Sequence, residues 1–165
     1  MLKVDESLHK RVTYEQTTLE DVIDRSGGDS ASCFDLVCCS EVIEHVHDQQ
    51  TFLRNALRLV KPKTGLFFLS SIAKTPEGWF LNIFMGEKVL GLLPKGTHEY
   101  EMLISPESVE QIVHAGNPDH DILPFQTIQK TGAFLANPMT MEMKEVDSFL
   151  RGNYMIMFKP RQDIV

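Results

Sequence analysis

The sequence predicts an α/β fold whose sheet is at least partly parallel, and three consecutive segments carry this prediction. "CFDLVCC" (33–39) is a nearly continuous apolar run, as expected for a strand buried on both faces. Residues 48–62 place apolar side chains at helical spacing, and Asp48 is the expected N-cap of this helix. "GLFFLSSI" (65–72) is a second apolar strand. Strand, helix and strand in this order predict one βαβ crossover.

Two further elements are expected before this crossover. "KRVTYEQTT" (10–18) alternates well enough for a short strand with Val12 and Tyr14 on one face. "TLEDVIDRS" then predicts a short helix with Thr18 as its N-cap. "GGDSAS" (27–32) has the composition of a loop.

The second half of the chain predicts one clear helix and two strands. "SPESVEQIVHAG" (105–116) combines a serine N-cap, a proline at the first helical position and a glycine beyond the end. The strands are expected at 121–132 and 153–159, and they have no long helix between them. They therefore predict an antiparallel edge of the sheet.

A chain of 165 residues is expected to form one domain. Within it the sequence divides into a βαβ core (11–72), an apolar insert (75–104), and a helix with antiparallel strands (105–159). The insert concentrates large apolar side chains at 76–93, with lysines beside them. This block predicts either an interfacial or lid segment or an ordinary buried helix pair.

Composition narrows the possible partners. A net charge of −7 and a pI near 5.3 argue against nucleic acid, because phosphate binding needs a basic surface. The three cysteines lack CxxC spacing, which indicates reduced thiols rather than a zinc site. The opening "MLKVDESLHKRV" has neither the apolar core of a signal peptide nor the acid-poor composition of a transit peptide.

Glu41, Glu44 and His45 follow the first predicted apolar strand of the crossover at spacing i, i+3 and i+4. If this turn is helical, the three side chains share a face at the carboxyl end of a parallel strand, where α/β sheets place ligands. They can hold a divalent cation, and the histidine can instead serve as a general base. The alternative is that the carboxylates complement a helix dipole and the histidine is an ordinary polar group. Spacing alone leaves both interpretations open.

The segment "FDLVCCSEVIEHVHDQQTFLRNALRLVKPKTGLFFLSSI" resembles the second half of class I methyltransferases that use S-adenosylmethionine. Three further motifs identify a smaller family: "LPKGTHEYEMLISPESVEQIV" (93–113), "NPMT" and a terminal "NYM". They resemble the ubiquinone-biosynthesis O-methyltransferases. The resemblance covers roughly 11–159. It implies a Rossmann-like sheet with strand order 3-2-1-4-5-7-6.

This resemblance implies transfer of a methyl group from S-adenosylmethionine to a polyprenylated dihydroxybenzoate or a demethylated ubiquinol. Glu41, Glu44 and His45 match family positions that bind a divalent cation, usually Mg²⁺. Ser40 matches a position that contacts S-adenosylmethionine. His98, in the PKGTH stretch, is expected either to line the active site or simply to cap its loop. The candidate catalytic residues are His45, in the general-base role that its residue type allows, and His98.

The family also implies a setting for this activity. Its eukaryotic members work at the matrix side of the mitochondrial inner membrane, with other ubiquinone-biosynthesis proteins as partners. The apolar block at 76–93 is then expected to make a peripheral membrane contact and to collect the prenyl tail of the substrate.

The sequence departs from the family pattern in one respect. Family members begin with helices, a strand and a glycine-rich loop around the cofactor, and no Gly-x-Gly occurs in these 165 residues. The chain is therefore expected to enter the fold near its third strand, to leave a hydrophobic sheet edge exposed, and to be inactive when isolated. Two alternatives remain: a non-catalytic scaffold subunit of the biosynthetic complex, and a metal-dependent hydrolase, which lacks a nucleophile.

Overall fold

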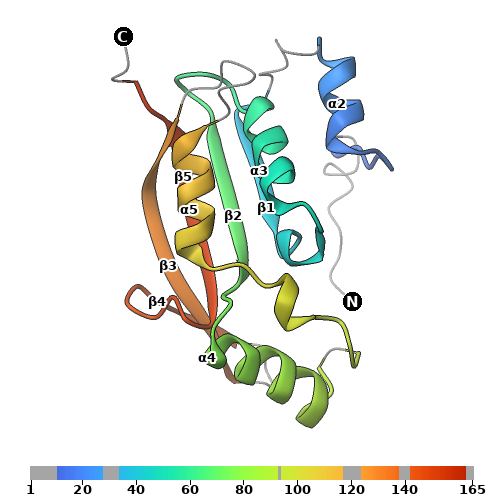
Figure 1. Ribbon diagram of the computed structural model, residues 1–165, viewed down its shortest axis with the longest axis vertical. Coiled ribbons are helices and arrows are strands. Elements are labelled where there is room, and N and C mark those ends of the chain that lie inside the picture. Colours follow the sequence, from blue (N-terminus) through green and yellow to red (C-terminus); the bar gives the residue numbers. More distant parts are fainter. Residues whose placement is uncertain (1–10, 28–33, 93, 117–123, 138–141, 163–165) are drawn as a thin grey trace.

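The computed structural model describes residues 11–27, 34–92, 94–116, 124–137 and 142–162 (Figure 1). Most of the expected loop at 27–32, the first residues of the strand expected at 121–132 and nearly all of the "NPMT" motif lie outside these ranges. In chain order the elements are α2 (Leu19–Arg25), β1 (Leu36–Ser40), the 3₁₀ turn η2 (Ile43–His45), α3 (Gln49–Arg58), β2 (Leu66–Ile72), α4 (Pro76–Gly78), the π-helix η3 (Trp79–Val89), the 3₁₀ turn η4 (Tyr100–Met102), α5 (Pro106–Ala115), β3 (Phe125–Asn137), β4 (Glu142–Val146) and β5 (Asn153–Pro160).

The strands form one mixed sheet in the order β1-β2-β5-β3-β4. β1 and β2 are parallel and α3 connects them, so the predicted βαβ crossover is confirmed. The other three pairs are antiparallel, as the late strands predict. β5 inserts between β2 and β3. The order β1-β2-β5-β3 therefore matches 4-5-7-6, the last four strands of the order 3-2-1-4-5-7-6 that the family resemblance implies. β4 is an additional strand that the sequence did not predict.

α3 and α5 lie side by side over one face of the sheet (Figure 1). Their apolar side chains and those of β2 and β5 form one buried cluster, whose members include Leu53, Leu57, Phe67, Leu69, Val109, Val113, Tyr154, Ile156 and Phe158. Both helices begin as predicted. The Asp48 side chain accepts a hydrogen bond from the Thr51 N–H at 3.0 Å, and Ser105 accepts one from the Ser108 N–H at 3.1 Å.

β1 lies at an edge of the described sheet, and only one of its faces is buried. Cys39 points to the α3 face and is 5% exposed, whereas Leu36, on the opposite face, is 53% exposed. The expectation of burial on both faces is therefore wrong for this strand. The exposed hydrophobic edge expected from the family resemblance is present in the described residues.

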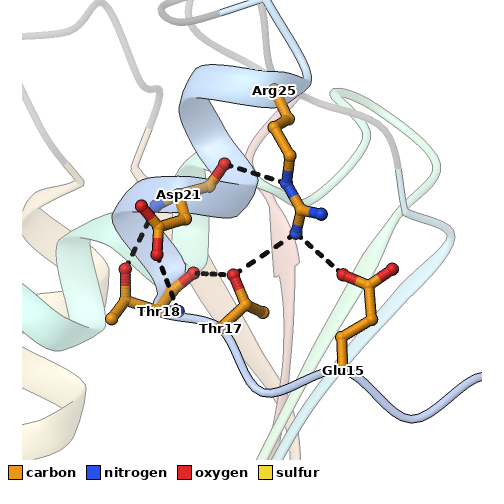
Figure 2. Close-up of polar contacts among 5 residues, drawn as sticks. All are labelled: Glu15, Thr17, Thr18, Asp21 and Arg25. Atoms are coloured by element: carbon orange, nitrogen blue, oxygen red, sulfur yellow. Dashed lines mark hydrogen bonds and ion pairs between the residues drawn. The ribbon is translucent and has the colours of Figure 1, made fainter.

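The segment before α2 is not a strand. The described residues 11–17 have no strand pairing, and Tyr14 is 90% exposed. The Arg25 guanidinium instead donates to Glu15 Oε2 at 2.8 Å and to Thr17 Oγ1 at 3.3 Å, which ties this segment to α2 (Figure 2). Without a neighbouring strand, an alternating segment has nowhere to place its backbone hydrogen bonds.

The predicted helix with Thr18 as its N-cap is confirmed as α2. Thr18 Oγ1 accepts from the Asp21 N–H at 3.2 Å, and Asp21 Oδ2 accepts from the Thr18 N–H at 3.3 Å (Figure 2). This reciprocal pair is a capping box, which satisfies two backbone donors at the helix start.

The apolar insert forms a short α-helical turn, α4, that continues into the π-helix η3 at one end of the sheet (Figure 1). Ile83 packs against Ile72 and Leu103. Most of its large apolar side chains are exposed, between 36% and 55%: Trp79, Phe80, Leu81, Phe84 and Val89. The insert is therefore not a buried helix pair. In the described ranges, no helix combines the length and apolar character needed to cross a bilayer.

Candidate metal and catalytic site

The candidate site begins where β1 and β2 end. Ser40 and Ser70 are register partners at the carboxyl ends of these parallel strands, and their hydroxyl oxygens lie 3.0 Å apart. The Ser70 hydroxyl donates to Glu41 Oε1 at 2.8 Å. Ser40, the predicted cofactor contact, thus sits at the strand ends where open α/β sheets bind ligands.

Glu41 occupies the sharp turn after β1. Its φ of 51° lies in the left-handed region, which is rare for a residue with a Cβ atom. Desolvation of its carboxyl group raises the pKa above the ordinary value, the Ser70 hydrogen bond opposes this, and the nearby negative charge of Glu44 adds to the increase. The carboxylates of Glu41 and Glu44 therefore lie close enough to repel each other.

Glu44 is the buried member of the site. It lies in the 3₁₀ turn η2 and is only 2% exposed. The Ser71 hydroxyl donates to its Oε2 at 2.8 Å, while its Oε1 is buried and has no hydrogen-bond partner. A buried carboxylate oxygen without a donor is costly, so this atom is suited to a bound cation.

His45 and His98 meet beside Glu44. Their rings stack with centroids 5.4 Å apart and an interplanar angle of 27°. One ligand atom from each of Glu44, His45 and His98 lies within 4.8 Å of the others. The structure thus brings together Glu44, His45 and His98, all singled out from the sequence. Glu41 lies beside them and accepts a hydrogen bond from Ser70.

The helix-dipole interpretation of the acidic residues does not fit this geometry. The helix that follows, α3, begins at Gln49 and is capped by Asp48, whose side chain accepts from the Thr51 N–H. Glu41 and Glu44 precede that helix, and Glu44 is buried against Ser71. Only part of the expected shared face forms, because the 3₁₀ turn covers residues 43–45 and leaves Glu41 outside it.

Sequence reasoning missed one residue of this site. Glu87, in η3, is 2% exposed, and its Oε1 lies 2.9 Å from His98 Nδ1. The available signal was a single acidic residue inside an otherwise apolar block, together with a histidine shortly after it. Neither feature has a spacing that identifies a site on its own.

A depression of about 550 Å³ lies between the starts of α3 and α5. Its lining includes Asp48, Lys74, Glu101 and Ser105, and none of Glu44, His45 and His98 contributes to it. We therefore do not assign it to the site. It lies next to η4, which leads from His98 into α5.

Comparison with known proteins places this geometry in a family. The model of the family described as "Methyltransferase domain" matches residues 4–117. The chain belongs to this methyltransferase family. The match includes the strand ends and all of the clustered residues, Glu41, Glu44, His45 and His98.

Among curated proteins, the chain is similar to mitochondrial ubiquinone biosynthesis O-methyltransferases. It is 38% identical to that of Mus musculus over 109 residues, which are 66% of this chain and 28% of that protein. It is 32% identical to the ubiquinone biosynthesis O-methyltransferase of Rhizobium etli over 148 residues, 90% of this chain and 54% of that protein. The chain thus matches between about a quarter and about half of the length of these relatives.

Solved structures support the fold of this methyltransferase domain. One is a methyltransferase of Thermotoga maritima that uses S-adenosylmethionine and is described as a possible histamine N-methyltransferase. It has a TM-score of 0.52 at 15% identity, and the match covers 80% of this chain and 58% of that one. The YcgJ protein of Bacillus subtilis has a TM-score of 0.50 at 14% identity, over 94% and 75% of the two chains. At such identities these matches concern the fold alone, which is the expected Rossmann-like α/β class.

Proposed function

We propose that this chain is part of an O-methyltransferase of ubiquinone biosynthesis that uses S-adenosylmethionine and holds a divalent cation at Glu44. The observation that carries the proposal is the buried, unpartnered Oε1 of Glu44, gathered with His45 and His98 at the carboxyl end of β1. The relatives named above, at 32–38% identity, supply the reaction class.

Glu44, His45 and His98 would hold the ion, with Glu41 as a further oxygen donor beside Glu44. A divalent cation at this position supplies charge that lowers the pKa of a phenolic hydroxyl. The family resemblance favours Mg²⁺, which prefers oxygen ligands, whereas two imidazoles suit Mn²⁺, Fe²⁺ or Zn²⁺. The donor set fits a divalent cation, and the identity of the ion is a matter for experiment.

The other polar residues of the site are proposed to bind the cofactor, orient Glu41 and accept the substrate proton. S-adenosylmethionine supplies the methyl group when bound, and Ser40, at the end of β1, is proposed to contact it. The Ser70 hydroxyl holds Glu41 and lies beside Ser40, so these groups form a polar rim next to the ion ligands. His45 is exposed and can take up the phenolic proton when it does not ligate the ion.

The exposed apolar surface of η3 is proposed to bind the prenyl tail and the membrane surface from which the substrate comes. Trp79 and Phe80 each stack on Phe84, with centroids 5.9 and 5.5 Å apart, and Lys88 lies over the Trp79 ring at 6.0 Å. Clustered aromatic rings with flanking lysines suit the interface of an anionic bilayer. The mammalian relatives are named as mitochondrial, which supports a mitochondrial location, and the matrix side of the inner membrane with other ubiquinone-biosynthesis proteins is the proposed setting.

The proposal is tested by methyl transfer to a short-chain prenylated dihydroxybenzoate, detected by mass spectrometry. The chain is assayed alone and as a chimera in which it replaces the aligned 148 residues of the Rhizobium etli relative. Methylated product that disappears with Glu44→Gln supports the proposal. A chimera with a native circular dichroism spectrum and no product contradicts it.

The alternatives receive less support. The comparisons do not favour a non-catalytic scaffold subunit, because the named relatives are O-methyltransferases. A hydrolase would need a nucleophile beside the ion ligands. The hydroxyls nearest to the acidic residues, Ser70 and Ser71, donate to Glu41 and Glu44.

A further inference from the structure

Glu87 is a fully buried acidic residue in a π-helix whose other side is exposed and apolar. It is 2% exposed, and each of its carboxylate oxygens accepts hydrogen bonds from the segment that follows the helix. Oε2 accepts from the Gly96 N–H at 2.8 Å, and Oε1 accepts from the His98 N–H at 3.0 Å. Oε1 also lies 2.9 Å from His98 Nδ1.

In these contacts both carboxylate oxygens of Glu87 act as hydrogen-bond acceptors. Each accepts from a backbone N–H group, Gly96 on Oε2 and His98 on Oε1, as the oxygens of an ionised carboxylate do. Because His98 Nδ1 faces this acceptor at hydrogen-bond distance, Nδ1 must carry the proton, and Nε2 is left with a free lone pair.

That lone pair matters because of where His98 lies. Its ring stacks on His45, and one of its nitrogens belongs to the group of ligand atoms gathered within 4.8 Å with Glu44. Nδ1 is engaged with Glu87, so Nε2 is the atom available to an ion. Histidines that bind metals commonly donate their second ring N–H to a carboxylate, which fixes both the tautomer and the ring orientation.

The π-helix explains why an acidic residue can occupy this place. Ile83, Gly86 and Glu87 are the buried residues of η3, while the aromatic rings face outward. The wider turn of a π-helix is often found at functional sites. Here it turns one carboxylate toward the loop that carries His98.

We propose that Glu87 is a positioning residue that holds His98 in the Nδ1–H tautomer and directs its Nε2 toward Glu44 and His45. The proposal rests on the ion site described under Proposed function and adds a residue that acts through His98. It also connects the exposed apolar helix to the site, because the same helix carries the aromatic surface and the carboxylate that orients the histidine.

The tautomer is measured directly by ¹⁵N NMR of the histidine-labelled chain without added ions, at pH about 8.5, above the ordinary imidazole pKa of about 6.5. The His98 signals are assigned with His98→Gln. The proposal predicts a protonated Nδ1 and an unprotonated Nε2 in the wild-type protein. An Nε2–H tautomer of His98 in the wild type overturns it.

The variant Glu87→Gln tests the role of the carboxylate. The expected result is a shift of His98 toward the Nε2–H tautomer and an affinity for Mn²⁺, measured by electron paramagnetic resonance, that falls by about 10–100-fold. Glu110→Gln removes another hydrogen-bonded carboxylate, on α5, and should change neither. Unchanged His98 signals and unchanged Mn²⁺ affinity in Glu87→Gln overturn the proposal. If wild-type protein shows the predicted tautomer but binds no ion, the proposed ion site fails instead.

Discussion

His98 stacks on His45 with ring centroids 5.4 Å apart, so the segment after the π-helix closes onto the turn after β1. The two rings come from distant parts of the chain, and both lie beside the buried carboxylate of Glu44. This contact joins the acidic turn to the insert, and each prediction below concerns the site that it forms or the fold that supports it.

Glu44→Gln should abolish ion binding and stabilise the ion-free protein. Glutamine still accepts from Ser71 but removes the buried charge whose Oε1 has no partner. We expect the free energy of unfolding in chelator to rise by about 1 kcal/mol, measured by urea denaturation. Glu110→Gln is the matched control: both of its oxygens accept hydrogen bonds, so that variant should be destabilised. A Glu44→Gln protein less stable than wild type in chelator would contradict this account of Glu44.

Thr127→Val should weaken the attachment of α5 to β3 and reduce the dependence of stability on pH. Burial raises the pKa of Glu110, but hydrogen bonds from Thr127 and Lys130 outweigh it, so the folded-state pKa lies below the ordinary value. A depressed carboxyl pKa contributes stability above the unfolded value, about 4.3, and that contribution is lost as the pH falls through the folded pKa. Removing the Thr127 hydrogen bond should cost about 1 kcal/mol at pH 7 and flatten the acid limb of urea-denaturation curves. An unchanged acid limb would contradict the assignment.

Cys39 should resist thiol reagents in the native protein, whereas Cys38 should react. Burial, followed by the negative charge of Glu44, raises the pKa of Cys39 to about 12, while Cys38 is exposed on the other face of β1. Because the thiolate is the reactive form, a variant that retains only Cys39 should show no labelling by iodoacetamide at pH 8 until urea is added. Rapid labelling of that variant under native conditions would contradict the burial of this face.

Replacing Phe80 and Phe84 by serine should weaken binding to vesicles. These rings form the centre of the exposed aromatic surface on η3. In cosedimentation with vesicles that contain cardiolipin, the double variant should remain in the supernatant at lipid concentrations that pellet the wild type. Tyr14→Ser removes an even more exposed ring outside the insert and should bind as wild type does. Equal loss in both variants would indicate non-specific hydrophobic adsorption.

The parts of the fold that depend on local signals could be predicted from the sequence. Thr18, Asp48 and Ser105 each cap the helix that they were expected to cap, because a cap is made by residues within one turn. The prediction of a strand before α2 was wrong because a strand forms only where a neighbouring strand pairs with its backbone. β4 was missed because its residues lack the apolar run that identifies a buried strand.

The site was predictable only in part, for a related reason. The acidic turn follows an apolar strand, so Glu44 and His45 could be placed at a strand end. That His98 completes the cluster, and that Glu87 holds it, depends on how the insert returns to the sheet, which no local spacing encodes. The π-helix is equally hidden, since its residues have the composition of an ordinary apolar helix.

The central claim, that Glu44, His45 and His98 together hold a divalent ion, is tested most directly by Mn²⁺ titration of the wild type and of His98→Gln, with Mg²⁺ as competitor. The account predicts one ion per chain in the wild type, tighter binding of Mn²⁺ than of Mg²⁺ because imidazoles are among the ligands, and a loss of at least about tenfold in affinity in His98→Gln. Wild-type affinity in His98→Gln, or no saturable site in the wild type, would contradict it.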